Sequence, residues 1–468
     1  MLFNSYTFLV FFTIFLIAYH LIRIRSHVLS KIWILLGSCV FYAWSYPPYL
    51  ILLFWSITID FTIAKKIHSS KSNILRKRLM QLSILLNLGI LGFFKYSNFF
   101  ISNLNSFLSH NLEFLDIVLP VGISFYTFQS MSYTVDVYRR KICPERSMLN
   151  FCVYVSFFPQ LVAGPIVLAR DFLGQLKVKQ HISMEKILSG LFLIFTGLFL
   201  KCVVADRVAI SVDYFYSDIS RYSGFEVWYY CILYSIQIFG DFAGYSNIAI
   251  GLGLLMGFHL PENFRSPYLA VSITDFWRRW HISLSTWLRE YLYISLGGNR
   301  KGEYLTYVNL LITMLLGGLW HGASWNFVIW GGLHGVYLII ERRSRVTGGL
   351  VKFFSPRFSF IGKCLSVFLT FNIVTFTWIF FRSPSLATSQ LVISQLFESY
   401  SLDSVVLVSK NAVFLFLLYG LMVKLLVFLQ SKSRDRFYPV FLSASFLLLV
   451  HTIVTLGTRS NSFIYFQF

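Results

Sequence analysis

Long apolar runs, separated by short polar and mostly basic segments, are the main pattern of this sequence. A helix needs about 20 apolar residues to cross the roughly 30 Å hydrocarbon core of a bilayer. Uncharged runs that approach or exceed that length recur along the chain, at residues 1–22, 32–59, 79–94, 117–135, 149–169, 187–200, 242–260, 304–340, 364–381 and 437–457. The pattern predicts an all-α polytopic membrane protein.

The ends of these runs indicate how the chain is threaded. The first run, residues 1–22, lacks the basic leader and the small-residue cleavage site of a secretory signal, so we expect a membrane anchor. Basic clusters between the runs mark the cytoplasmic side. Residues 32–59 lie between two such clusters and contain Pro47 and Pro48 at their centre, which predicts two short crossings joined by an outer turn. Residues 79–94 and 117–135 form a second pair.

Residues 149–169 do not fit a simple crossing. Basic residues flank both sides, yet the run is too short to cross twice, and Pro159, Gly164 and Pro165 interrupt any helix. Non-helical backbone at membrane depth is tolerated only where protein or a water-filled cavity surrounds it. We therefore expect a re-entrant segment that lines a site.

The longest uncharged run, residues 304–340, also has basic residues at both ends. One helix of that length would reach about 56 Å, nearly twice the hydrocarbon thickness. Its glycines favour a hairpin instead, with His321 near the break. The pairs Gly318/Gly322 and Gly331/Gly335 are typical of close helix packing.

Composition and charge support this class of protein. The chain is 56% hydrophobic and 13% charged, against roughly a quarter charged in soluble proteins. Its longest polar stretch is 262–303, so we expect one membrane domain over residues 1–468 and no soluble domain. The formal charge of +20 follows from the cytoplasmic clusters, so nucleic acid is not an expected partner. Residues 265–301 are basic enough to bind the phosphates of coenzyme A or an acidic carrier protein, although a solvated cytoplasmic face explains them equally well.

The candidate chemical centre is the pair His281 and His321. Drawn as one helix, residues 274–293 place Trp277, Trp280 and His281 on one side, with Arg278 and Arg279 mainly elsewhere. Such an amphipathic helix is expected at the cytoplasmic interface. Each histidine could be a hydrogen-bonded packing residue, but ionisable groups inside a membrane tend to mark substrate paths.

An imidazole at this place is suited to acyl transfer. It can take the proton of a hydroxyl that attacks an activated acyl group, if a donor stabilises the developing oxyanion. Asn326 is a nearby amide donor, and Trp277 and Trp280 could exclude water from a thioester.

Two other features concern metals and a buried charge. No carboxylate accompanies His281, His321 or His334 at ligand spacing, and the six cysteines are scattered, so no metal site is predicted. Asp241 is a charge within an apolar stretch. It is expected to pair with an arginine such as Arg207 or to orient a catalytic imidazole, the former being the commoner arrangement.

Several strings of this sequence closely resemble the membrane-bound O-acyltransferase (MBOAT) family, in the bacterial polysaccharide branch that contains AlgI, PatA and DltB. The likeness runs over about residues 1–382, and the final part, with expected transmembrane helices at about 411–457, is generic. The most specific strings are WRRWHISLS and LWHG. They lie within RSPYLAVSITDFWRRWHISLSTWLREYLYISLGGNR (265–300) and GGLWHGASWNFVIWGGLHG (317–335), and LPVGISFYTFQSMSYTVDVYR (119–139), FFPQLVAGPI (157–166), KCVVADR (201–207) and DFAGYSNIAIGLGLLMGF (241–258) add to them.

The resemblance implies a funnel of about eleven transmembrane helices plus re-entrant ones, open on both sides of the membrane. It implies that His321 is the catalytic histidine and His281 the second functional one. Trp277, Arg278, Arg279, Trp280, Trp320 and Asn326 would then lie along the substrate and acyl-donor path, with Asp241 as a structural or orienting residue.

The implied function is O-acetylation of a cell-envelope polysaccharide by a multi-pass protein of the bacterial inner membrane. Acetyl-CoA would be the cytoplasmic donor, with no tightly bound cofactor, and a periplasmic or surface transferase of the SGNH serine-hydrolase type would be the partner. Two alternatives remain open at this stage. One is D-alanyl transfer from a carrier protein to teichoic acid, and the other is a solute transporter without covalent chemistry.

Overall fold

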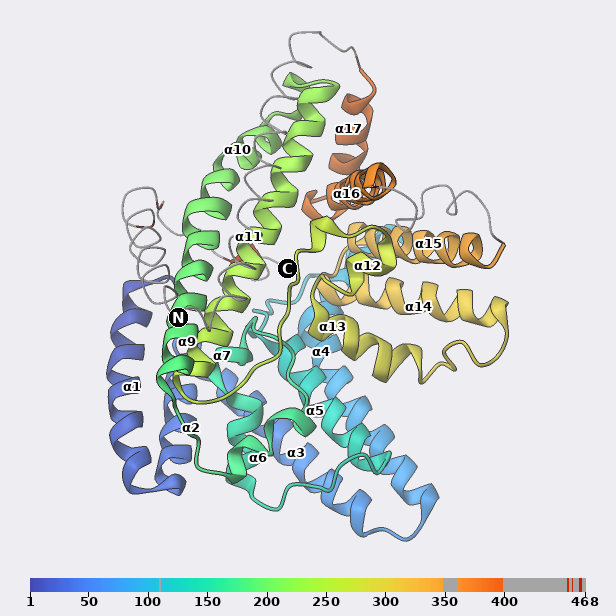
Figure 1. Ribbon diagram of the computed structural model, residues 1–468. Helices are drawn as coiled ribbons and strands as arrows, with labels where there is room; N and C mark the ends of the chain where they lie inside the picture. The colour runs from blue at the N-terminus through green and yellow to red at the C-terminus, as the bar shows by residue number, and fades with distance from the viewer. Residues whose placement is uncertain (109–110, 348–359, 399–452, 454–456, 458–462, 465–468) are drawn as a thin grey trace.

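The computed structural model describes residues 1–108, 111–347, 360–398, 453, 457 and 463–464 (Figure 1). Within these ranges the regular structure is entirely helical, which confirms the all-α class. The C-terminal transmembrane helices expected at about 411–457 lie outside the described residues, apart from two isolated positions.

The helices in chain order are α1 (Tyr6–Arg25), α2 (His27–Ala43), α3 (Tyr49–Ser69), α4 (Asn73–Leu108), α5 (Ile123–Tyr138), α6 (Met148–Ser156), α7 (Phe158–Leu161), α8 (Ala169–Phe172), η1 (Gln175–Lys177), α9 (Met184–Leu198), η2 (Phe199–Ala205), α10 (Asp206–Ser217), η3 (Ile219–Arg221), α11 (Phe225–Leu255), η4 (Pro267–Leu269), α12 (Ile273–Trp277), α13 (Ile282–Trp287), η5 (Leu288–Tyr293), α14 (Glu303–His321), α15 (Trp325–Thr347), α16 (Phe360–Arg382) and α17 (Leu386–Leu396).

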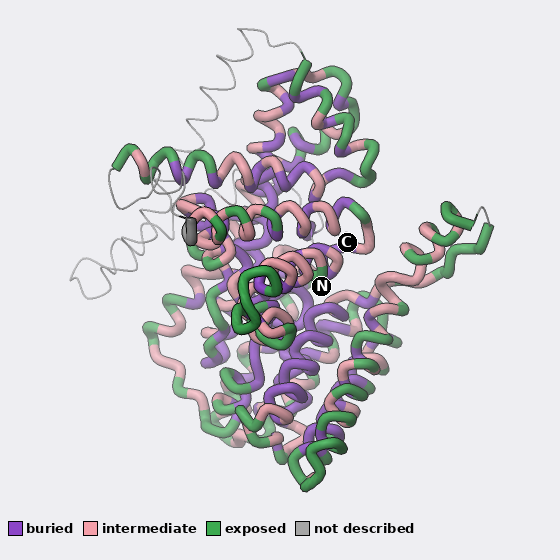
Figure 2. The backbone as a smooth tube through the Cα atoms, turned by 90° about the vertical axis from the view of Figure 1, so that its right-hand side faces the viewer, coloured by how far each residue is buried: buried purple, intermediate pink, exposed green. Residues whose placement is uncertain are grey.

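Five of the described helical segments are long and apolar enough to cross a bilayer: α1, α4, the continuous run α9–η2–α10, α11 and α16. The outer helix α1 turns apolar side chains away from the protein, among them Leu9, Ile14 and Leu21, each about 60% exposed. Figure 2 shows the same division, with buried segments in the interior and exposed ones at the periphery. Exposed apolar surface of this extent is typical of contact with lipid, so the polytopic class is confirmed.

The hairpins predicted within two of the apolar runs, 32–59 and 304–340, are present. Helices α2 and α3 are separated at Pro47 and Pro48, and α14 and α15 are separated between His321 and Trp325. The second hairpin is packed through glycines. A Cβ added at Gly318 would lie 2.1 Å from the Phe327 carbonyl oxygen, and one at Gly331 would lie 2.2 Å from that of Met314. The backbones of α14 and α15 therefore touch, as small residues allow.

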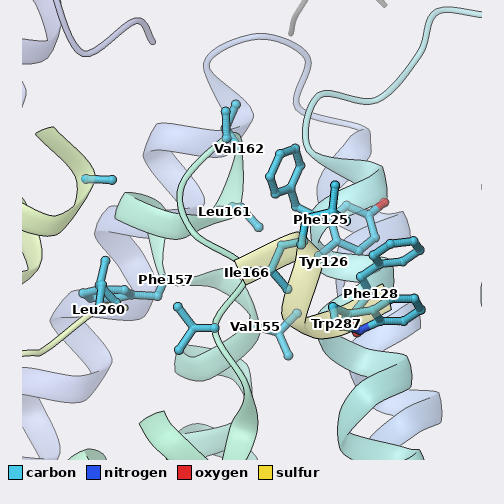
Figure 3. Close-up of a cluster of buried hydrophobic side chains, with 14 of the residues drawn as sticks. Phe125, Tyr126, Phe128, Val155, Phe157, Leu161, Val162, Ile166, Leu260 and Trp287 are labelled. Carbon is cyan, nitrogen blue, oxygen red and sulfur yellow. The ribbon is translucent and has the colours of Figure 1, made fainter. Parts of the chain in front are cut away.

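The segment expected to be re-entrant is interrupted as predicted. Helix α6 is followed by the four-residue α7, and the chain then runs without helix to α8. Every residue from 150 to 169 is buried. Figure 3 shows Phe157, Leu161 and Ile166 from this segment in one apolar cluster with Phe125 and Trp287. Surrounding protein thus covers the irregular backbone.

The expectation of one continuous helix over residues 274–293 is wrong. The segment consists of α12, a turn, α13 and the π-helix η5. His281 has a φ of +43°, in the left-handed region that non-glycine residues adopt uncommonly, with asparagine, aspartate and histidine the most frequent among them. Helix α12 ends before this residue and α13 begins after it. The helical periodicity that assigns residues to one face therefore does not continue across His281.

Gly318→Ala tests the contact between α14 and α15. We expect the methyl group to push the backbones apart and lower the free energy of unfolding by about 1–3 kcal/mol, as overpacking does. Thermal unfolding of the purified protein in detergent measures the change. Gly89→Ala in α4 is the control, because an added Cβ there meets no atom within 4 Å. Equal melting temperatures for the two variants would contradict the close contact.

Candidate active site

The two histidines singled out in the sequence meet in the interior. Their ring centroids lie 6.4 Å apart. His281 is fully buried and His321 is 3% exposed. His281 occupies the turn between α12 and α13, whereas His321 is the last residue of α14. Two separate sequence motifs therefore supply one centre from two chain breaks.

Asn263 fixes the orientation of His281. Its Oδ1 lies 3.1 Å from Nδ1 of His281, and the same oxygen accepts hydrogen bonds from the backbone N–H and the hydroxyl of Ser283 at 3.2 and 2.9 Å. A backbone N–H can only donate, so this atom of Asn263 is the carbonyl oxygen and Nδ1 of His281 is the donor. In neutral His281 the lone pair is consequently on Nε2.

Aromatic rings from three helices surround His321. Trp320 of α14, Trp330 of α15 and Phe381 of α16 have ring centroids 4.9, 5.0 and 5.2 Å from its imidazole, each at a steep angle. Trp320 also lies 6.0 Å from His281, so its ring is close to both imidazoles. Edge-to-face packing of this kind holds each ring in place.

The tryptophans of the WRRWH string support this wall. Trp280 is fully buried and packs against Trp378 at 5.1 Å. Trp277 packs against Trp330 at 5.7 Å, and its indole N–H donates to Nδ1 of His334 at 3.3 Å. Both side chains therefore lie in the aromatic wall, and their part in excluding water stays a prediction.

His334 is a third buried histidine, and its hydrogen bonds give it a structural role. Nδ1 accepts from Trp277, so Nε2 carries the proton and donates to the hydroxyl of Thr377 at 3.0 Å. That hydroxyl in turn donates to the Val374 carbonyl. This chain ties α12, α15 and α16 together. Among the described residues, no three His, Cys, Asp or Glu side chains come together as metal ligands.

The two arginines of the string differ in their surroundings. Arg279 donates to Asp275 at 2.9 Å, and its charge is therefore compensated. Arg278 is exposed to solvent. Of the two, Arg278 is the one whose charge is available to an anionic ligand.

Asn326 is not placed as the sequence suggested. Its amide nitrogen donates to the Ser383 carbonyl at 2.7 Å, and its oxygen accepts from the Ser389 hydroxyl at 3.2 Å. Both ends of the amide thus connect α15 with α16 and α17. These bonds are the reason that Asn326 serves packing rather than presenting an oxyanion donor.

Asp241 also differs from expectation in its partner. Its carboxylate lies 2.6 Å from the ammonium of Lys201, which also contacts Asp206 at 2.8 Å. The backbone N–H of Ile464 donates to its second oxygen. Structural pairing was expected, but with Arg207. Asp241 does not orient His281, because Asn263 is the residue bonded to Nδ1.

Sequence reasoning missed Asn263 and Lys201. Asn263 stands in the polar segment ENF, where nothing distinguishes it from a loop residue. Lys201 is the first residue of the KCVVADR string. Asp241 lies forty residues away, so the sequence gives no direct sign that the two side chains pair. Lysines and carboxylates buried inside a membrane normally pair with each other. The presence of Lys201 and Asp241 in apolar stretches was therefore the one indication in the sequence that they form an ion pair.

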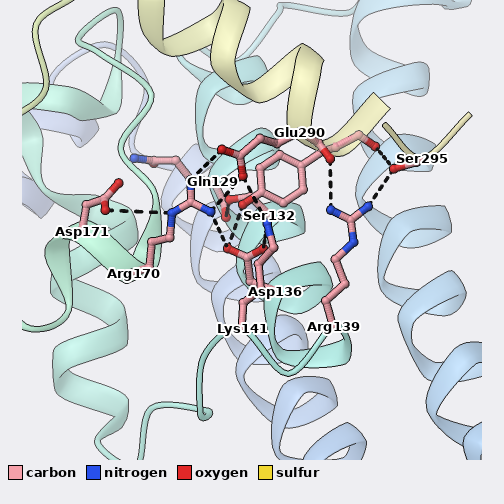
Figure 4. A network of polar contacts seen from close by, with 10 residues as sticks. Gln129, Ser132, Asp136, Arg139, Lys141, Arg170, Asp171, Glu290 and Ser295 are labelled. Atoms are coloured by element: carbon pink, nitrogen blue, oxygen red, sulfur yellow. Dashed lines mark hydrogen bonds and ion pairs between the residues drawn. The ribbon is translucent and has the colours of Figure 1, made fainter. Parts of the chain in front are cut away.

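A second polar network holds η5, the helix at the C-terminal end of the segment that contains His281 (Figure 4). Arg170 donates two hydrogen bonds to Glu290 of η5, at 2.8 and 2.9 Å, and Lys141 adds a third at 3.2 Å. Tyr291, also of η5, donates to Asp136 of α5 at 2.8 Å. The π-helix that follows His281 is thereby fixed to α5 and α8.

Glu290 gives a pH-dependent test of this network. The Arg170 hydrogen bonds lower the pKa of Glu290 from 4.5 to about 2, so its stabilising effect is complete above pH 4.5 and is lost as the pH falls towards 2. We expect Glu290→Gln to have a lower melting temperature than the wild type at pH 7 and a smaller deficit at pH 3. Thermal unfolding in detergent measures both.

Glu262→Gln is the control, because its partner Arg265 and Glu262 itself are largely exposed and such pairs contribute little. A Glu290→Gln deficit that is the same at pH 7 and pH 3 would contradict the assignment.

Comparisons with known proteins identify the family. A family model described as MBOAT, membrane-bound O-acyltransferase family, matches residues 78–383, which include both histidines. The chain is 38% identical to a peptidoglycan O-acetyltransferase of Helicobacter pylori, over 79% of this chain and 74% of that protein. It is 40% identical to a probable alginate O-acetylase AlgI of Pseudomonas aeruginosa, over 85% and 75%.

A more distant relative has a different name. The chain is 28% identical to a teichoic acid D-alanyltransferase of Bacillus subtilis, over 51% of this chain and 64% of that protein. The match of the family model over more than half of the chain, together with the identities above, decides the classification. The protein belongs to the membrane-bound O-acyltransferase family and is an acyltransferase.

Proposed function

We propose that the protein transfers an acetyl group from cytoplasmic acetyl-CoA across the bacterial inner membrane for O-acetylation of a cell-envelope polysaccharide. The observation that carries this proposal is the meeting of His281 and His321, buried 6.4 Å apart in an aromatic enclosure. The relatives at 38% and 40% identity bear the names of a peptidoglycan and an alginate O-acetylating protein, which favours an acetyl group and a polysaccharide acceptor.

His321 is the proposed general base. An acceptor hydroxyl attacks the thioester carbonyl, its proton passes to the imidazole of His321, and a C–O bond forms. The C–S bond then breaks, and the thiolate of coenzyme A takes up the proton. His281, held by Asn263 with its lone pair on Nε2, is the second proton-handling group. The surrounding rings exclude water that would hydrolyse the thioester.

Trp320 and Trp330 are the proposed donors to the carbonyl oxygen. Their indole N–H groups are buried and make no hydrogen bond within the part of the protein that the structure describes. A buried donor without an acceptor costs about 1–3 kcal/mol, so such groups usually serve a ligand or water. Both rings contact His321 at about 5 Å. They replace Asn326, whose amide is engaged elsewhere.

The donor is proposed to approach from the cytoplasmic side, where Arg278 is exposed and the segment 265–301 is basic. Phosphate groups of coenzyme A suit such a surface. The acceptor side is proposed to involve a periplasmic or surface transferase of the SGNH type. D-alanyl transfer from a carrier protein is the second candidate, supported by the more distant relative.

His321→Ala tests the proposed chemistry. We expect transfer of radiolabelled acetyl from acetyl-CoA to polysaccharide to fall by about 10²–10⁴, the usual contribution of a general base. Inverted membrane vesicles of a deletion strain that expresses the variant are suitable, because their outer surface is the cytoplasmic face, to which acetyl-CoA can be added.

His259→Ala is the matched control, since this histidine is exposed and lies outside the site. A solute transporter would leave acetyl transfer unchanged in His321→Ala. Labelling by a D-alanyl carrier protein, with none from acetyl-CoA in the wild type, would favour D-alanyl transfer and overturn the proposal.

Trp320→Phe tests the proposed indole donor. We expect kcat to fall by about 10²–10³, as loss of an oxyanion donor does, with little change in the KM for acetyl-CoA. Trp325→Phe is the control, because that indole is half exposed and donates to Asn103 instead. An unchanged kcat in Trp320→Phe, at equal amounts of folded protein, would remove the indole from the mechanism.

A further inference from the structure

Two consecutive residues of α4 reach the end of the helix that carries His321. The ammonium of Lys95 donates to the backbone carbonyls of Trp320 at 2.6 Å and of His321 at 3.0 Å. The hydroxyl of Tyr96 donates to the carbonyl of Leu319 at 2.8 Å. Three successive carbonyls of the last turn of α14 are thus bound by side chains of a helix more than two hundred residues away in the chain.

These carbonyls need partners from outside their own helix. The last four C=O groups of an α-helix have no hydrogen-bond partner within that helix. The hydrocarbon core of a membrane contains no water that could replace the missing donors. The same helix end carries a partial negative charge, which a cation stabilises. Lys95 supplies both the donors and the cation at one position.

The charge of Lys95 is not explained by membrane topology. It is the single Lys or Arg between Arg78 and Arg139, so it belongs to none of the basic clusters. An isolated lysine between two apolar runs is costly unless it has a specific partner. The carbonyls of Trp320 and His321 are that partner.

The contact bears directly on the position of the imidazole. Helix α14 ends at His321, and the next residue, Gly322, is already extended, with φ −163° and ψ 152°. A Cβ added at Gly322 would lie 2.1 Å from the ring of Phe327. The backbone is therefore held by Lys95 at His321 and packed closely against Phe327 at the next residue.

The neighbouring Trp320 is held by the same group of residues. The ammonium of Lys95 lies 5.9 Å from the centre of its ring. Phe125 and Phe128 of α5 each pack against that ring at 5.5 Å. A shift of the end of α14 would therefore move both the base and the proposed indole donor.

We infer that Lys95, assisted by Tyr96, is a positioning residue that sets the end of α14 and thereby the place of the His321 imidazole opposite His281. Lys95 acts through the backbone of His321 and takes no part in the bond changes. The inference rests on the proposed function for its kinetic readout, and on the hydrogen bonds between α4 and the end of α14 for its structural one.

Lys95→Met tests this role, because methionine keeps most of the volume and removes the ammonium. A displacement of about 1 Å in a catalytic group can cost about 10²-fold in rate. We therefore expect kcat for acetyl transfer in inverted vesicles to fall about 10- to 100-fold. The KM for acetyl-CoA should stay nearly unchanged, because a misplaced base affects the transition state and not substrate binding. Lys95→Arg should recover most of the activity, because it retains a cation with several donors.

Lys65→Met is the matched control. Lys65 also donates to a backbone carbonyl, that of Arg146, but it is exposed and lies apart from the two histidines. We expect wild-type kcat for this variant. A wild-type kcat in Lys95→Met, or a loss that merely follows a smaller amount of folded protein, would overturn the inference. Equal loss in the arginine and methionine variants would do the same.

A second measurement does not depend on activity. Diethyl pyrocarbonate modifies neutral imidazoles, and mass spectrometry can follow its reaction with His321 in the purified protein. We expect faster modification in Lys95→Met than in the wild type and no change in Lys65→Met. Unchanged modification in Lys95→Met would overturn the positioning role. Absence of acetyl transfer in the wild type would instead overturn the proposed function and leave this result standing.

Discussion

The site depends on a helix that ends inside the protein. An α-helix can cross a membrane because all its backbone groups are paired internally, and that pairing stops at its last turn. His321 occupies this position in α14, where the backbone can turn and bring the imidazole against residues of other segments. Side chains of α4 satisfy the exposed carbonyls, so the break is compatible with burial. A histidine within a regular helix would lack this freedom of approach.

His281 also lies at a break between two helices, but other residues hold it there. The chain is broken there by a left-handed residue, and one asparagine oxygen accepts from the imidazole and from Ser283. The π-helix beyond it is fixed by Glu290 and Tyr291. Each imidazole is thus held through its backbone or its second nitrogen, and the ring of Trp320 packs close to both. Fixed orientation of a catalytic ring by such neighbouring groups reduces the reorganisation needed during reaction.

Local pattern was sufficient for much of this architecture. The proline pair in 32–59 and the glycines of 304–340 predict the two hairpins, because they determine where a helix must end. The WRRWH and LWHG strings indicate the two histidines. The break at His281 was not predictable, because the segment around it has helical periodicity and no glycine or proline. The error came from applying that periodicity across a residue whose conformation is imposed by tertiary contacts.

The partners of the site residues were harder to predict than the residues themselves. Lys95 and Asn263 contact the histidine segments from distant or irregular parts of the chain. The isolated charge of Lys95 indicates that it has a partner, but nothing local to either residue indicates which one. Asn326 and Asp241 illustrate the converse. Their types suit an oxyanion donor and an orienting carboxylate, but α16, α17 and Lys201 already engage them. Residue type limits the possible roles, and only the packing of helices selects among them.

The aromatic surroundings of the two histidines bear on the choice of acceptor. The chain is almost equally similar, at 38% and 40%, to relatives named for two different polysaccharides, so overall likeness does not select between them. Three aromatic rings pack against His321, and their carbon surface does not distinguish one sugar hydroxyl from another. Specificity in a binding site comes from a small number of precisely placed polar groups. If the histidine centre acts as proposed, discrimination among acceptors comes from polar groups outside this ring cluster or from a partner protein.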